Sequence, residues 1–170
     1  MFHAIQISYN TSMDTDSKDT IEFLKEREAK LGHPLRFRTY STWFAKLGGE
    51  KREWGVFLYS DGITMVYEDF DREPTFLGIP IKRKNKEEYI KLEASFPVKD
   101  IKDISLVPRT AAEASFKMAK DLSKSAGSFS KLLRRTVSKI TLEDGTIYFM
   151  ELMDHKGFIK LIKEFQREAK

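Results

Sequence analysis

Residues that could support catalysis are few, and they do not form a complete catalytic pattern. Ser128 and Lys131 match the Ser-x-x-Lys spacing, which places a nucleophilic hydroxyl one helical turn from an amine. With 13 Ser and 20 Lys in 170 residues, such a match is expected by chance, and the companion motifs are absent. No glycine-rich phosphate loop and no His-Glu-x-x-His zinc motif occurs. The sequence therefore predicts no enzyme and nominates no catalytic residue.

Metal ligands are equally scarce. The chain has no Cys, and His3, His33 and His155 lie far apart with no partner at helical ligand spacing. The acidic stretch 14–19 lacks the glycine and the bidentate Glu of a calcium loop, and helix capping explains its carboxylates better. We predict neither a metal nor a cofactor.

Positive charge is concentrated in two segments. Thirty Lys and Arg against 26 Asp and Glu give +4, but 109–139 alone carries eight bases and two acids, and 81–91 carries five and two. The densest basic run consists of Lys82, Arg83, Lys84 and Lys86. Two interpretations of this run remain open. It is a solvated loop whose lysines discourage aggregation at a sheet edge, or it contacts an anionic ligand at about 1 kcal/mol per basic residue.

Residues 109–135 form a basic, helix-prone insert in which apolar and basic side chains alternate. The candidate contact residues in it are Phe116, Lys117, Phe129, Lys131, Arg134 and Arg135. Either the insert packs on a sheet with its lysines in water, or it contacts a membrane interface or a partner. Nucleic acid is not favoured, because the net charge is low and the aromatic residues form no evident stacking platform.

Apolar residues spaced by three and four predict helices near both ends of the chain. The first covers 17–31 and ends at Gly32. A short helix is expected over 41–47, with inward side chains Trp43, Phe44 and Leu47. The last covers about 154–168, and its inward stripe consists of Phe158, Leu161, Ile162 and Phe165.

Between these helices the chain predicts a meander of six or seven strands. Asp61-Gly62 and Asp144-Gly145 each join two β-rich runs, which is a strong hairpin signal. Further strands of the meander are expected at 75–83, 89–96 and 98–107, and two extended segments are expected before it, at 2–9 and 35–40. Successive hairpins, rather than alternating strands and helices, argue against a Rossmann sheet and indicate an α+β fold.

Three stretches after residue 53 share a family pattern. They are the hairpin 54–70, the segment Phe96-Pro-Val-Lys-Asp-Ile-Lys-Asp-Ile that leads into a middle strand, and the hairpin 140–149 with its following helix. In these features the chain resembles a pleckstrin-homology-like domain, nearest to GRAM-type and related bacterial members. The resemblance implies a bent antiparallel β-barrel closed at one end by the C-terminal helix. Members that bind phosphoinositides carry Lys and Arg in the first hairpin loop, whereas here that loop contains Asp61.

The expected organisation is a helical N-terminal segment, 1–52, followed by a pleckstrin-homology-like barrel, 53–170, with the insert at about 109–135. The expected function is a non-enzymatic adaptor that contacts a protein partner or an anionic phospholipid surface through its basic faces. The alternative is a structural module that forms homo-oligomers and binds no lipid. Apolar runs are too short for a transmembrane helix and no secretory signal is evident, so we expect a cytoplasmic protein, peripheral at a membrane if lipid is bound.

Overall fold

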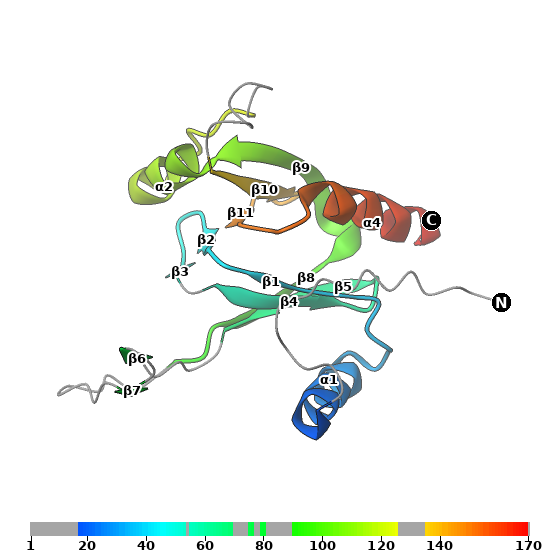
Figure 1. Ribbon diagram of the computed structural model, residues 1–170. Helices are drawn as coiled ribbons and strands as arrows, with labels where there is room; N and C mark the ends of the chain where they lie inside the picture. Colours follow the sequence, from blue (N-terminus) through cyan, green and yellow to red (C-terminus); the bar gives the residue numbers. More distant parts are fainter. Residues whose placement is uncertain are drawn as a thin grey trace.

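A computed structural model describes residues 17–53, 55–69, 75–76, 79–80, 90–125 and 135–169. It shows an α+β architecture of two antiparallel sheets, with one helix near each end of the chain (Figure 1). Helix α4 (His155–Glu168) closes the space between the sheets, while α1 (Lys18–Leu31) lies on the outer side of the first sheet. Together these elements form the frame that positions every side chain discussed below.

The first sheet has the strand order β1-β4-β5-β8. Its strands are β1 (Phe37–Ser41), β4 (Val56–Ser60), β5 (Thr64–Glu68) and β8 (Glu93–Pro97). Both faces of β4 are buried, because Val56 and Leu58 face the second sheet while Phe57 and Tyr59 face α1. A strand covered on both sides is a near-continuous apolar run, which is what residues 56–59 are.

The second sheet has the order β3-β2-β11-β10-β9. Its strands are β2 (Phe44–Lys46), β3 (Lys51–Arg52), β9 (Ile101–Pro108), β10 (Thr136–Leu142) and β11 (Ile147–Met150), and the 3-10 helix η1 (Val98–Asp100) links β8 to β9. Helix α2 (Arg109–Met118) continues directly from β9 and packs on the outer face of this sheet. Within the described residues the two sheets are paired separately and close no barrel.

Three apolar clusters separate four layers of structure. The largest lies between the two sheets and includes the four predicted α4 residues, all of which are buried. The second lies between the second sheet and α2, and the third lies between the first sheet and α1. Strands β1 to β3 belong to the same sheets as the later strands, so strand pairing crosses the expected boundary between residues 52 and 53.

The short helix expected over 41–47 is wrong, because this segment forms β2. Phe44 enters the cluster between the sheets, whereas its neighbours Trp43 and Ala45 enter the cluster under α2. That alternation has the period of a strand. Pairing of β2 with β11 and β3 supplies the partners. The burial expected for Trp43 and Phe44 is confirmed, but tertiary pairing overrides the local helical pattern.

Both predicted hairpins and both terminal helices are confirmed. Gly62 and Gly145 adopt φ values of +97° and +86° in the hairpin turns, a region that favours glycine. Ser17 caps α1 by accepting the N–H of Thr20, and Gly32 ends it in a left-handed conformation. Asp154 caps α4 by accepting the N–H of Gly157.

The remaining strand predictions have mixed outcomes. The strand expected over 75–83 is divided, since β6 (Thr75–Phe76) and β7 (Ile79–Pro80) pair with each other as a small separate sheet. The strand expected at 35–40 is confirmed as β1, and the one at 89–96 begins at Glu93. The strand expected at 98–107 begins at Ile101, because Val98–Asp100 forms η1. The strand expected over 2–9 lies outside the described residues.

Candidate functional site

Most of the predicted contact residues lie outside the described part of the chain. These are Lys82, Arg83, Lys84, Lys86, Phe129, Lys131 and Arg134. The structure describes the other three, Phe116, Lys117 and Arg135, and separates them into different environments.

Phe116 lies on the face of α2 that packs on the second sheet. Ala112 and Ser115 are buried on that face, and Phe116 is half-buried against the same apolar cluster. The ammonium of Lys51 lies 5.8 Å from the centre of the Phe116 ring, within the range of a cation–π contact. The helix therefore presents other side chains to solvent.

The turn that follows α2 is held by a network of hydrogen bonds around Ser115. The Ser115 hydroxyl donates to the carbonyl of Ala111 at 2.8 Å and accepts the N–H of Leu122 at 2.9 Å. Lys120 N–H donates to the carbonyl of Ser115, and Ala119 takes a left-handed φ of 48°. Because a left-handed alanine is strained, the surrounding hydrogen bonds must fix this turn.

Asp121 ties the same turn to the second sheet. Its carboxylate accepts the N–H and the hydroxyl of Ser123 at 3.1 and 2.6 Å, and it pairs with Lys139 on β10. Burial opposes ionisation here, but the hydrogen bonds from Lys139 and Ser123 prevail and lower the pKa of the Asp121 carboxyl. Asp121 is thus a structural anion whose charge is already matched.

This fixed turn displays apolar and basic side chains together. We call residues 117–124 the α2 turn. Met118 is 67% exposed and Leu122 is 47% exposed, although the backbone that carries them is ordered by hydrogen bonds. The three lysines are Lys117, Lys120 and Lys124, all exposed, and none has a carboxylate partner among the described residues. The α2 turn is therefore a cationic surface with an apolar centre.

Arg135 has a different environment at the opposite end of α2. It pairs with Glu151, and Glu151 also accepts Arg109 at 3.1 Å and the hydroxyl of Thr42 at 2.9 Å. Arg109 makes a further contact with Glu113 at 3.0 Å. Both arginines are therefore neutralised by carboxylates from neighbouring elements.

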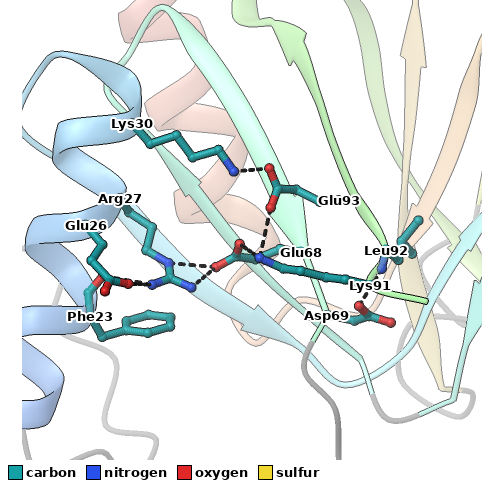
Figure 2. A network of polar contacts seen from close by, with 9 residues as sticks. All are labelled: Phe23, Glu26, Arg27, Lys30, Glu68, Asp69, Lys91, Leu92 and Glu93. Carbon is teal, nitrogen blue, oxygen red and sulfur yellow. Dashed lines mark hydrogen bonds and ion pairs between the residues drawn. The ribbon is translucent and has the colours of Figure 1, made fainter. Parts of the chain in front are cut away.

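A second polar network, which sequence reasoning missed, attaches α1 to the first sheet. Figure 2 shows it around Glu68, whose side chain is 1% exposed. One carboxylate oxygen accepts Arg27 of α1 at 2.7 Å, and the other accepts Lys91 at 2.8 Å. Lys30 of α1 pairs with Glu93 nearby. The only sequence signal was a pair of acids, Glu68 and Asp69, at the end of an apolar strand, and that does not predict burial.

The Glu68 network serves attachment rather than chemistry. Both carboxylate oxygens are occupied by cations, so neither is open to a metal ion or a proton donor. The centre of the Phe23 ring lies 3.6 Å from the guanidinium carbon of Arg27 (Figure 2). The same ring meets Phe57 of the sheet edge to face, with ring centres 5.3 Å apart. Charge and aromatic packing together fix α1 to this face.

One Ser–His pair occurs among the described residues. Ser138 Oγ lies 2.7 Å from Nδ1 of His155, the distance of a nucleophile and its base. However, Ser138 is 1% exposed, so a substrate cannot reach its hydroxyl. No group of three or more acidic or histidine residues in the described chain could hold a metal ion.

The first hairpin loop also carries a structural acid. Asp61 is buried, and one of its oxygens accepts the N–H groups of Ile63 and Thr64, both at 2.8 Å. Arg36, which lies beside Gly62, is paired with Glu168 of α4. The acid of this loop is therefore used to hold the turn, and Arg36 beside it is already paired.

Comparison with known proteins identified no relative of this chain. No protein-family model matches the chain, and no curated protein sequence is similar to it. In the described residues, no helix combines the length and the apolar character that crossing a bilayer requires.

Proposed function

We propose that this protein is a non-enzymatic module that attaches reversibly to an anionic membrane surface through the α2 turn. One observation carries the proposal: an ordered turn holds Met118 and Leu122 out in solvent among three lysines that have no carboxylate partner in the described part of the chain. Exposed apolar side chains surrounded by cations are typical of protein segments that lie at a lipid interface. A carboxylate partner for those lysines would have argued against it.

The expected strength is modest. Three lysines near an anionic surface contribute about 3 kcal/mol together, and two apolar side chains that enter the headgroup region add to this. Such a sum gives weak, reversible attachment, comparable to that of one anchoring signal. Stable residence would need a second contact.

The pleckstrin-homology-like fold is part of this proposal. Two antiparallel sheets followed by a C-terminal helix support it, although the family's usual headgroup loop is occupied here by the structural acid Asp61. The α2 turn lies on a different element, the segment between β9 and β10. We therefore propose attachment by general charge and apolar contact rather than by recognition of one headgroup.

Co-sedimentation with liposomes tests the proposal. Replacing Lys117, Lys120 and Lys124 by Gln should weaken binding to phosphatidylserine vesicles about 100-fold. The matched control replaces Lys156, Lys160 and Lys163, which are exposed on α4, by Gln and should leave most of the binding intact. Equal losses in both variants would mean that only net charge matters.

A second variant tests the contribution of the apolar side chains to vesicle binding. Replacing Met118 and Leu122 by Gln should weaken vesicle binding by a factor that does not change between low salt and about 0.15 M salt, whereas the lysine effect should shrink as salt rises. No sedimentation of the natural protein with any anionic vesicle at low salt would contradict the proposal. A protein partner would then be the hypothesis to pursue.

The second candidate function is self-association, and the edge of β9 favours it. Among the described strands this eight-residue strand pairs only with β10, so its other edge is open to a further strand. Lys102 and Asp103 are exposed on this strand, and such charged side chains disfavour nonspecific pairing of its edge with other strands. Light scattering that shows a stable dimer would favour this function, and a monomer at high concentration would exclude it.

A further inference from the structure

Helix α1 is attached to the first sheet by less apolar contact than α4 makes with the core. The four side chains of the apolar stripe of α4 are all buried, whereas Thr20 is the one buried residue of α1. Phe23, Leu24 and Leu31 of α1 contact the sheet but are only half-buried. Because apolar burial supplies most of the free energy that docks a helix, α1 is the more weakly held of the two helices.

The acids that hold α1 also share a cation that does not belong to the helix (Figure 2). Arg27 pairs with Glu68 at 2.7 Å, and Lys30 pairs with Glu93. Lys91 contacts both carboxylates, that of Glu68 at 2.8 Å and that of Glu93 at 2.9 Å. When α1 moves away, Lys91 therefore remains as a counter-ion for both acids, and water reaches them. Departure of the helix leaves no isolated charge buried, which is the usual cost of separating a buried ion pair.

The docked helix also covers a polar group that has no partner. Tyr59 on β4 is 0% exposed in the cluster under α1, and its hydroxyl has no hydrogen-bond partner in the part of the chain that the structure describes. Burial, assisted by the charge of Glu68, raises the pKa of Tyr59 to about 12, so the hydroxyl is a neutral donor at neutral pH. A buried donor without an acceptor opposes docking, so hydration of this hydroxyl favours departure of α1.

A short hinge connects α1 to the first sheet. The helix ends at Gly32, whose φ of +77° is left-handed, and Pro34 follows two residues later. Along the described chain, the first backbone hydrogen bond to this sheet is the one that Arg36 N–H donates to the carbonyl of Ser60 at 2.9 Å. The residues between the helix and this bond are therefore able to change conformation without disturbing strand pairing.

We propose that α1 is a detachable cover, which opens about the hinge 32–35 while both sheets and α4 stay folded. The open form exposes Phe57 and Tyr59, whose ring centres lie 5.4 Å apart, on the outer face of the first sheet. The contacts of Arg27 and Lys30 then control access to this aromatic face. The proposal does not depend on membrane attachment, because α1 and the α2 turn belong to different sheets.

Thiol labelling measures the opening, because the chain has no cysteine of its own. Val66 lies in the cluster under α1 and is 4% exposed, whereas Val56 lies in the cluster between the sheets and is 0% exposed. Val66→Cys should react with a small thiol reagent about 100-fold faster than Val56→Cys under native conditions, since only the second thiol requires the sheets to separate. Equal labelling rates of the two thiols would overturn the proposal.

A charge variant tests whether the ion pairs hold the cover in place. Adding Arg27→Gln should speed the labelling of Val66→Cys about tenfold and leave that of Val56→Cys unchanged. The matched control is Lys25→Gln, which removes the same charge from an exposed position of α1 that has no ion-pair partner among the described residues. This control should change neither rate. Equal effects of the two substitutions on the Val66→Cys thiol would overturn the proposal.

Amide hydrogen exchange of the natural protein supplies a measurement that needs no substitution. Amides in the middle of α1 should be protected about 100-fold less than amides in the middle of α4, because the cover opens without the core. The same protection in both helices would mean that α1 leaves only when the whole protein unfolds, and this would overturn the proposal.

Discussion

Both ends of the described segment 109–125 are positively charged, but only one end is paired with acidic side chains. At its start, Arg109 is paired with Glu113 and Glu151, and Arg135 joins it on Glu151. At its end, the three lysines of the α2 turn have no carboxylate partner among the described residues. The difference comes from Glu151, which follows β11 and lies 42 residues from Arg109 in sequence. Availability of a cation is therefore decided by which acids the strands bring to it.

Acidic residues also differ in whether they are paired with cations. Glu68 is buried and holds two cations between α1 and the first sheet, whereas Glu143 is exposed and has no ion-pair partner among the described residues. A paired, buried charge stabilises the fold only while its partners remain, and an unpaired, exposed charge contributes little to stability and is available for binding. Three predictions test this distinction, in order of decreasing effect.

The largest effect is expected for Glu68→Gln. This change leaves Arg27 and Lys91 facing a neutral amide in a buried site, so the free energy of unfolding should fall by about 3 kcal/mol. Urea denaturation measures it, with Glu143→Gln as the matched control that should change stability by less than about 0.5 kcal/mol. Equal effects of the two substitutions would refute the distinction between paired and unpaired acids.

A smaller effect is expected for Glu151→Gln. The change removes the acceptor shared by Arg109 and Arg135 at the end of β11, so unfolding should become easier by about 1–2 kcal/mol. Vesicle binding should not fall, because the α2 turn is unchanged and two arginines lose their counter-charge. A fall in vesicle binding, measured beside the thermal midpoint, would show that the paired end also contributes to attachment.

The smallest effect concerns acid pH. The pKa of the Asp121 carboxyl is lowered in the folded protein, so its contribution to stability is complete above the unfolded-state value of about 3.9 and is lost as the pH falls toward the folded value. The natural protein should therefore lose slightly more stability than Asp121→Asn between about pH 5 and pH 2. Denaturant titrations at each pH compare the two, and identical slopes would mean that the pair with Lys139 adds nothing.

Sequence patterns predicted the elements that depend on neighbouring residues. The hairpins around Asp61-Gly62 and Asp144-Gly145 are confirmed because a two-residue turn signal lies between apolar runs. The apolar stripe of α4 is confirmed because a period of 3.6 places one face toward the core. The helix predicted over 41–47 was wrong because Phe44–Lys46 pairs with two strands. One of them, β3, follows shortly after Gly48-Gly49, but the other, β11, lies about a hundred residues later and no local pattern indicates it.

Sequence alone determined the α+β class, the terminal helices, the hairpins and the presence of a basic segment after β9, since each follows from local periodicity, turn chemistry or charge. Tertiary structure alone decided which charges are available. Burial of Glu68 under α1, pairing of Arg135 with Glu151, and stacking of Phe96 on Tyr148 in the core between the sheets all join residues that are distant in sequence. The physical reason is that ion pairing and burial depend on distance in space, and only the folded sheets set that distance.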